Sequence, residues 1–262
     1  MLFSALLFQI FAAATALAIP TSSERRAERT HLSHPNQIIS GPVAVSEGTN
    51  ATQAEFSSNW AGAVLVSAAN TYKSVTGTFV VPTPREPSGG TGFHSASAWV
   101  GIDGDTCQTA ILQTGIDLTV SGSSVSYDAW YEWYPAFAFD FTGINIRSGD
   151  SITATVVASS LTSGTATIIN HSTGQQVSHS FTLQPPLCQE NAEWIVEDYD
   201  ENGAMVPLAN FGTVTFTGAS AGTSSGTVGP AGATIINMEQ GGRVLTSVSV
   251  SSSTVTVEYI GP

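Results

Sequence analysis

Carboxylates, amides and large aromatic side chains are concentrated in three short stretches of the chain. They read AWVGID (98–103), TAILQTGID (109–117) and DAWYEWY (128–134). In an extended strand, alternate side chains point to opposite faces. One face then carries Trp99, Asp103, Gln113, Asp117, Asp128, Trp130, Glu132 and Tyr134. A face that mixes acids, an amide and aromatic rings suits a cleft for a polymeric substrate better than a hydrophobic core.

A fourth stretch, AEWIVEDY (192–199), carries two further carboxylates. As a strand it places Glu193, Ile195 and Glu197 on one face and Trp194 on the other. Two acids on one face among apolar neighbours are candidates for general acid–base chemistry. The alternative is that this is simply a solvated outer face of a sheet.

Several common catalytic arrangements are absent from the sequence. Gly-x-Ser-x-Gly occurs twice, at 218–222 and 222–226, but a serine nucleophile elbow needs a strand followed by a helix, and no helical period follows either match. No Asp-Thr-Gly or Asp-Ser-Gly motif signals a pepsin-type site. His94, His171 and His179 are scattered and lack the spacing of zinc ligands. We therefore expect no metal and no cofactor, and the chemistry that remains belongs to carboxylates and amides.

The elements that must position these residues are predicted to be strands. Short β-rich runs alternate with Gly, Pro, Ser and Asn turn signals, and no useful helical period appears. We predict one all-β domain, an antiparallel β-sandwich of two large curved sheets of jelly-roll or concanavalin-like type. The expected strands are 60–67, 74–81, 95–103, 109–117, 126–134, 151–159, 164–170, 176–183, 192–199, 212–217, 233–238, 244–250 and 254–260.

The N-terminal part of the chain differs from the rest. Residues 1–18 are apolar and end in Ala-Leu-Ala, which predicts a secretory signal peptide, and no later apolar run is long enough to span a membrane. Residues 19–56 hold three of the seven basic residues. They are either a disordered tail or, as we prefer, a basic prosegment that lies against an acidic cleft until acid releases it. The catalytic domain would then comprise 57–262. Asn50 and Asn170 begin glycosylation sequons.

Charge and cysteine content narrow the function classes. The formal net charge of −13 argues against nucleic acid or an anionic membrane as a partner. The scarcity of cations also favours tolerance of acid, because few charges remain to repel one another once the carboxylates are neutral. Two cysteines in a secreted chain, Cys107 and Cys188, are expected to form a disulfide. The disulfide would close a loop of about 80 residues, and the lower entropy of the unfolded chain would then stabilise the fold by roughly 4–5 kcal/mol.

Four long motifs resemble those of the glutamic peptidases, or eqolisins, a mostly fungal family of secreted acid endopeptidases. They are SNWAGAVL (58–65), AWVGIDGDTCQTAILQTG (98–115), YDAWYEWYP (127–135) and LCQENAEWIVED (187–198). The resemblance implies a sandwich of two curved antiparallel sheets and a catalytic pair formed by Gln113 and Glu193. It also implies that Cys107 and Cys188 are paired. The supporting cleft positions that it implies are Trp99, Asp103, Asp117, Asp128, Trp130, Glu132, Tyr134 and Glu197.

On this interpretation Glu193 activates water and Gln113 stabilises the oxyanion, with Asp103 or Glu132 orienting the amide. The expected partners are polypeptide substrates and the chain's own prosegment, and the expected state is a monomer. Two alternatives remain open. One is a jelly-roll glycoside hydrolase that uses Glu132 and Glu193. The other is a carbohydrate-binding module in which Trp130, Trp133 and Tyr134 form a stacking platform.

Overall fold

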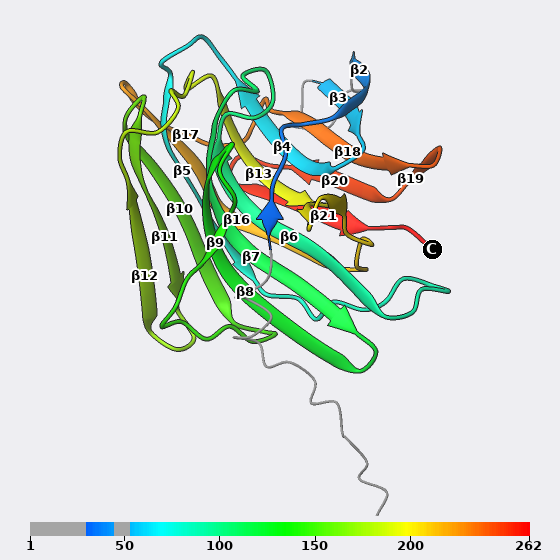
Figure 1. The fold of residues 1–262 in the computed structure, drawn as a ribbon. Coiled ribbons are helices and arrows are strands. Elements are labelled where there is room, and N and C mark those ends of the chain that lie inside the picture. Colours follow the sequence, from blue (N-terminus) through cyan, green and yellow to red (C-terminus); the bar gives the residue numbers. More distant parts are fainter. Residues whose placement is uncertain (1–29, 45–52) are drawn as a thin grey trace, which may run out of the picture.

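Two large β-sheets pack face to face, and a small third sheet lies at one side (Figure 1). The computed structural model describes residues 30–44 and 53–262; the predicted signal peptide, Arg25, Arg26, Arg29 and the Asn50 sequon lie outside these residues. No helix among the described residues has the length and apolar character needed to cross a membrane.

The ten-stranded sheet has the order β2-β3-β18-β4-β13-β6-β7-β8-β9, with β19 paired to β18. Its central strands carry all four motifs of the sequence, so this sheet positions the candidate site. The strands are β2 (Ile38–Ala44), β3 (Gln53–Ser57), β4 (Trp60–Val66), β6 (Phe93–Ile102), β7 (Ile111–Ser121), β8 (Ser124–Tyr134), β9 (Phe139–Asp140), β13 (Asn191–Glu197), β18 (Thr234–Gln240) and β19 (Arg243–Val244).

The eight-stranded sheet has the order β12-β11-β10-β5-β16-β21-β20, with β17 paired to β16, and the three-stranded sheet has the order β1-β14-β15. The strands of the larger are β5 (Tyr72–Val80), β10 (Ser151–Ser160), β11 (Ser163–Asn170), β12 (Gln175–Phe181), β16 (Thr213–Thr223), β17 (Gly226–Val228), β20 (Thr246–Val250) and β21 (Thr254–Tyr259). Those of the smaller are β1 (His31–Leu32), β14 (Asp200–Glu201) and β15 (Ala204–Met205).

The predicted all-β sandwich is confirmed, and each predicted strand overlaps an observed one. The run 244–250 is divided, because the backbone N–H of Leu245 donates to the carbonyl of Met238 between β19 and β20. The sandwich is not wholly antiparallel, since β3 pairs with β18 in parallel. The sequence analysis missed β1, β2, β3, β9, β14, β15 and β17, most of them too short to show a periodic pattern.

The two faces of the ten-stranded sheet have different roles. Ala192, Trp194 and Val196 of β13 point between the sheets into the main core, where the Trp194 Nε1–H donates to the carbonyl of Thr76 on β5 at 2.8 Å. Ile195, the alternate residue, packs instead in a separate apolar cluster on the other face. The alternation predicted for 192–199 is therefore confirmed.

Residues N-terminal to position 57 contribute to the sheets. The boundary expected between 56 and 57 falls inside β3, which is bonded to both β2 and β18. The described part of the expected prosegment thus makes regular backbone pairings with the domain and does not behave as a separate tail.

The structure places the cysteine pair and the Asn170 sequon that the sequence analysis noted. Cys107 and Cys188 form the expected disulfide, with their Cα atoms 6.1 Å apart. Asn170, by contrast, is fully buried, and its Nδ2 donates to the Asn145 carbonyl and to the Asp150 carboxylate. The folded chain therefore does not present Asn170 for glycosylation.

Candidate active site

Four register-matched residues form a row across the centre of the ten-stranded sheet. Glu193 on β13 is opposite Gly101 on β6, Gly101 is opposite Gln113 on β7, and Gln113 is opposite Glu132 on β8. Neighbouring strands lie about 4.8 Å apart, so the backbones that carry Glu193 and Gln113 are about 10 Å apart. Both side chains point to the face away from the main core, and Gly101 lies between them.

Gly101 allows the two side chains to approach each other. A Cβ atom on this residue would lie 3.0 Å from Glu193 Oε1, 3.3 Å from the Cβ of Gln113 and 2.8 Å from Cζ3 of Trp99. Any side chain here would therefore separate the carboxylate from the amide. The sequence analysis did not single out Gly101, although this residue lies between Trp99 and Asp103 on the same face of the predicted strand.

Glu193 and Gln113 are both fully buried and both lack a hydrogen-bond partner among the described residues. Burial raises the pKa of Glu193 well above its ordinary value, and the charges of Asp103 and Asp105 raise it further. Buried polar groups are normally paired, so two unpaired groups on either side of a glycine are typical of a functional site rather than a core.

A second row of polar residues crosses the same face near the other end of β13. Glu197 is opposite Ser97, Ser97 is opposite Asp117, and Asp117 is opposite Asp128. Burial raises the pKa of Glu197 to about 8, against the opposing effect of hydrogen bonds from its neighbours. The predicted carboxylates therefore do converge on one face, and they do so in rows set by the strand register.

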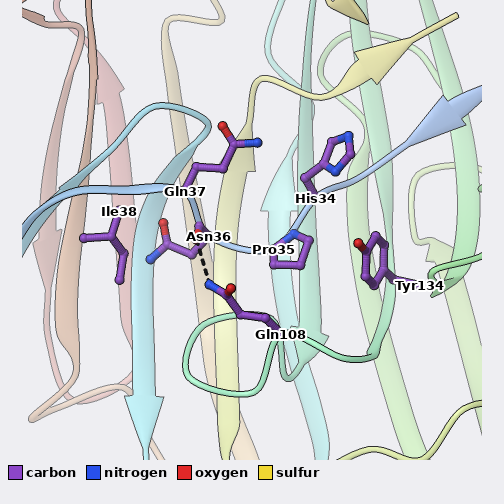
Figure 2. A pocket seen from close by; sticks show the side chains of 7 residues that line it. All are labelled: His34, Pro35, Asn36, Gln37, Ile38, Gln108 and Tyr134. Carbon is purple, nitrogen blue, oxygen red and sulfur yellow. Dashed lines mark hydrogen bonds between the residues drawn. The ribbon is translucent and has the colours of Figure 1, made fainter. Parts of the chain in front are cut away.

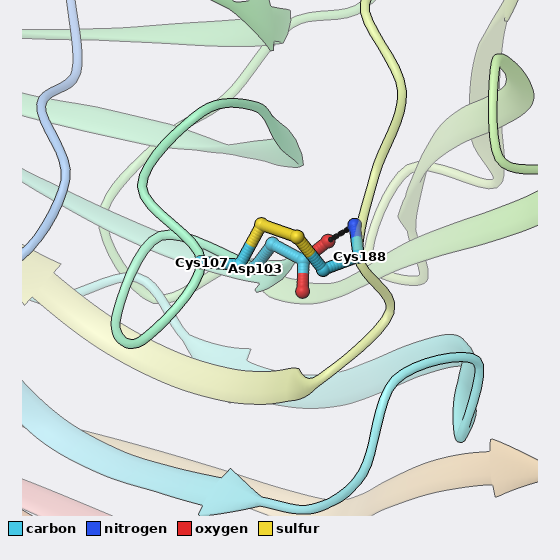
Figure 3. Close-up of side chains that lie close together, drawn as sticks. All are labelled: Asp103, Cys107 and Cys188. Atoms are coloured by element: carbon cyan, nitrogen blue, oxygen red, sulfur yellow. Dashed lines mark hydrogen bonds between the residues drawn. A yellow bond between two sulfur atoms is a disulfide. The ribbon is translucent and has the colours of Figure 1, made fainter.

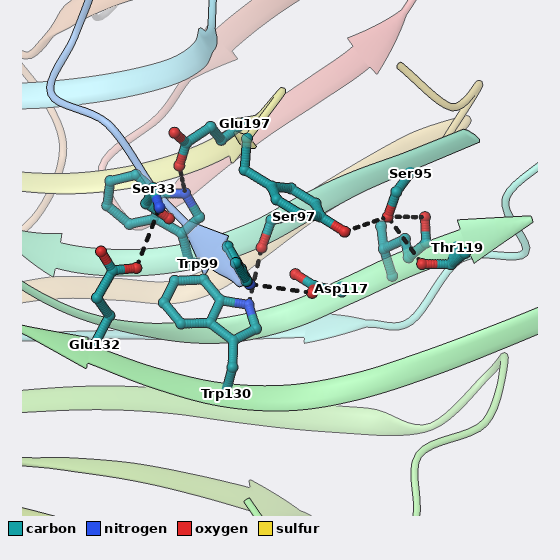
Figure 4. Close-up of polar contacts among 12 residues, drawn as sticks. Ser33, Ser95, Ser97, Trp99, Asp117, Thr119, Trp130, Glu132 and Glu197 are labelled. Atoms are coloured by element: carbon teal, nitrogen blue, oxygen red, sulfur yellow. Dashed lines mark hydrogen bonds and ion pairs between the residues drawn. The ribbon is translucent and has the colours of Figure 1, made fainter. Parts of the chain in front are cut away.

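Aromatic rings separate the two rows. Trp99 donates from Nε1 to Glu197 Oε2 at 3.0 Å, and Trp130 donates from Nε1 to Ser97 Oγ at 2.9 Å (Figure 4). Both rings belong to the apolar cluster of this face, against which Tyr134 packs. Trp133 lies on the opposite face, in the core between the sheets, so it cannot form one platform with Trp130.

Asp103 has a structural role in the loop before β13. Its carboxylate accepts hydrogen bonds from the backbone N–H groups of residues 188–191 at 2.8–3.2 Å, beside the disulfide (Figure 3). Neither Asp103 nor Glu132, the two residues expected to orient the Gln113 amide, makes a side-chain hydrogen bond to it among the described residues. Asp103, Cys107 and Cys188 lie close together, but both sulfur atoms are used in the disulfide and are not available as thiolate metal ligands.

Residues 30–37 cross this face and cover it. The backbone N–H of Ser33 donates to Glu132 Oε2 at 3.2 Å (Figure 4). The backbone N–H of His34 donates to Glu197 Oε1 at 2.9 Å. His31 lies with its Nδ1 3.3 Å from Asp117 Oδ2, and its ring packs edge-on against Trp130 and at a tilt against Tyr199. This cover explains why so many carboxylates of the site are buried.

Glu132 shows the effect of this cover on charge. It is fully buried, and its pKa is raised well above the ordinary value by burial first and by the nearby Glu197 and Asp117 second. The main-chain donor Ser33 opposes that shift. A neutral carboxyl at this position would still accept the Ser33 hydrogen bond, so the cover does not depend on Glu132 being charged.

The sequence of this chain is similar to those of known peptidases over most of its length. A sequence profile described as the Peptidase A4 family matches residues 58–259. Aspergillopepsin-2 of Aspergillus niger is 46% identical over an alignment of 284 positions that covers 99% of this chain and 100% of that protein. Scytalidopepsin B of Scytalidium lignicola is 44% identical over 80% of this chain and 81% of its own length.

Solved structures agree with these sequence matches. The crystal structure of scytalido-glutamic peptidase with a transition-state analogue inhibitor superposes with a TM-score of 0.71 at 44% identity, covering 78% of this chain and 98% of that one. The aspergilloglutamic peptidase of Aspergillus niger superposes with a TM-score of 0.63 at 55% identity, covering 64% of this chain and 99% of that one.

Proposed function

The chain belongs to the peptidase A4 family of glutamic-type endopeptidases, and we propose that it is secreted and cleaves polypeptides in acid with Gln113 and Glu193 as its catalytic pair. The observation that carries the assignment of the pair is the row Glu193–Gly101–Gln113, in which a carboxylate and an amide face each other across a glycine. Family membership also favours the peptidase over the two carbohydrate-related alternatives.

The reaction follows from the chemistry of these two groups. Ionised Glu193 removes a proton from water, and the water oxygen bonds to the carbonyl carbon of the scissile peptide. The amide N–H of Gln113 donates to the oxyanion and cannot be lost by titration in acid. Protonated Glu193 then passes its proton to the leaving nitrogen as the C–N bond breaks.

Residues 30–37 belong to a prosegment that inhibits the enzyme by occupying the cleft. Its contacts with Glu132, Glu197 and Asp117 support this role. No carbonyl of the described segment is hydrogen-bonded to Gln113, so the segment covers the pair without offering it a scissile bond. Once the segment leaves, water reaches Glu193, and its pKa falls towards the ordinary 4.5, where a general base for acid conditions is needed.

Two imidazole–carboxylate contacts help to hold the segment at the cleft. His31 faces Asp117 at 3.3 Å, and His34 Nε2 lies 3.0 Å from Asp200 Oδ2. Protonation of Glu197 is not expected to release the segment in acid, because its pKa of about 8 means that it already holds a proton above the acid range.

The test is hydrolysis of an unfolded protein at pH about 3 by the full chain and by Glu193→Gln. Glu258→Gln is a matched control, since Glu258 is exposed on β21 of the other sheet. We expect cleavage by the parent chain and the control, and none by Glu193→Gln with its circular dichroism spectrum unchanged. Equal cleavage by all three would remove Glu193 from the proposal.

A further inference from the structure

Residues 34–37 are held along both edges of their main chain. On one edge, the Pro35 carbonyl accepts from Asn59 Nδ2 at 3.2 Å, and the Gln37 N–H donates to Asn59 Oδ1 at 2.9 Å. On the other edge, the Asn36 N–H donates to the Gly104 carbonyl at 2.8 Å, and the Asn36 carbonyl accepts from Gln108 Nε2 at 3.0 Å (Figure 2).

This alternation is the hydrogen-bonding pattern of a strand between two partners. Successive peptide groups of an extended chain point to opposite edges, and here each edge finds a donor and an acceptor. The Asn59 side-chain amide bonds to residues on both sides of Asn36, as one residue of a neighbouring parallel strand would through its own N–H and C=O groups. Every polypeptide carries these main-chain groups, so such recognition does not depend on the bound side chains.

Asn59 is built into the fold in a way that suits this task. Its side chain is 1% exposed, and its Oδ1 also accepts from Ser57 Oγ at 2.9 Å, which fixes the orientation of the amide. Its own carbonyl accepts from the N–H of Asp198 at 2.8 Å, which ties it to the end of the segment that carries Glu193 and Glu197. Gln108, on the opposite edge, is an exposed side chain next to the disulfide.

The surface that holds residues 34–37 lies close to the proposed catalytic pair. Asp105, beside Gly104, lies near enough for its charge to act on Glu193. A cavity of about 510 Å³ is lined mainly by residues 34–38 themselves, together with Gln108 and Tyr134, and Tyr134 also packs on the cleft face (Figure 2).

We propose that Asn59 and Gln108 form a main-chain subsite of the substrate cleft, which binds an extended stretch of polypeptide and which residues 34–37 occupy until they are released. This inference rests on the proposed peptidase function and adds to it a site that recognises substrate length rather than side-chain type. Both residues are positioning residues, because neither reaches the reacting atoms.

The experiment compares Gln108→Ala and Asn59→Asp with the parent enzyme, each as the full chain activated in acid. The substrates are synthetic peptides that share one cleavage site and are extended residue by residue at either end. Beyond a certain length at one end we expect KM to be about three- to tenfold higher in each variant, the effect of one lost hydrogen bond, with kcat retained. The shortest peptides should be cleaved equally by all enzymes.

Gln176→Ala, at an exposed glutamine on β12, is the matched control and should leave the KM values for the whole series of peptides unchanged. Gln108→Ala keeps the test decisive if Asn59→Asp fails to fold, because Gln108 is exposed. The inference is overturned if KM in Gln108→Ala equals that of the parent enzyme at every peptide length, or if KM rises equally for the shortest peptides. If the parent chain cleaves no peptide at all, the proposed function fails first, and the two failures are thus distinguishable.

Discussion

Replacing Glu197 by Gln should flatten the pH dependence of folding stability. Glu197 is fully buried, accepts hydrogen bonds from Trp99 and His34, and has its pKa raised from 4.5 to about 8, mainly by burial. Between these two values the folded chain holds a proton that the unfolded chain has released. The free energy of unfolding therefore decreases as pH rises through this window and is greatest below pH 4.5.

The magnitude follows from the size of the shift. One pKa unit corresponds to about 1.4 kcal/mol, so a rise of about 3.5 units makes the parent protein up to about 5 kcal/mol less stable at pH 8 than at pH 4.5 through Glu197 alone. Gln cannot ionise, so this contribution disappears in the variant. A smaller slope should remain, because burial also raises the pKa of Asp198 to about 8 and that of Glu55 to about 7.

The assay is urea unfolding followed by tryptophan fluorescence at pH 4.5 and pH 8. All five tryptophans of the chain are buried, so their emission reports on the loss of the cores. Both proteins should carry Glu193→Gln, which by our proposal prevents self-digestion and contributes equally to each. The informative quantity is the difference between the two proteins in their stability change from pH 4.5 to pH 8. A difference near zero would refute the argument that burial keeps Glu197 protonated.

Three further substitutions test other parts of the structure. Gly101→Ala places a methyl group between the proposed catalytic side chains, and we expect peptide cleavage to fall about 100-fold or more while circular dichroism stays unchanged; a rate near that of the parent would show that the gap is not needed. Asp103→Asn turns a donor towards backbone N–H groups of residues 188–191 and should lower the free energy of unfolding by about 2 kcal/mol in urea titrations, whereas no change would contradict the anchoring role. Replacing Cys107 and Cys188 together by Ser should lower the free energy of unfolding by about 4 kcal/mol and remove the effect of reductant on the melting temperature. A melting temperature equal to that of the parent would argue against the loop-closure contribution.

The fold could be predicted well where local signals were strong. Alternation in 192–199 placed Trp194 on the core face and Glu193 on the other, and the structure agrees. Two-residue strands such as β1 and β14 could not be predicted, because a pair of residues shows no period and is held only by its partner. The parallel pairing of β3 with β18 joins residues about 180 positions apart in the chain, which no local pattern reveals.

The candidate site, like the fold, could be predicted from the sequence only in part. Motifs and alternation identified the acids, the amide and the aromatic residues of the cleft face, but they could not tell which were neighbours. Asp103 illustrates the limit: its carboxylate reaches the backbone of residues 188–191, a partner far away in the sequence, and not the nearby Gln113. Asn59 was also missed, because its role depends on a segment that folds back over it.

By itself, the sequence determined the chemical inventory and the face on which each side chain lies, because both depend on residue type and on the two-residue period of a strand. Only the tertiary structure decided the register. It inserts β13 between β4 and β6, so that Glu193 meets Gly101 and Gln113 in one row. It also lays residues 30–37 across the same face of the sheet, where they bond to Glu132 and Glu197. Register and cover depend on backbone pairings between distant segments, and only the packing of the whole chain selects among those pairings.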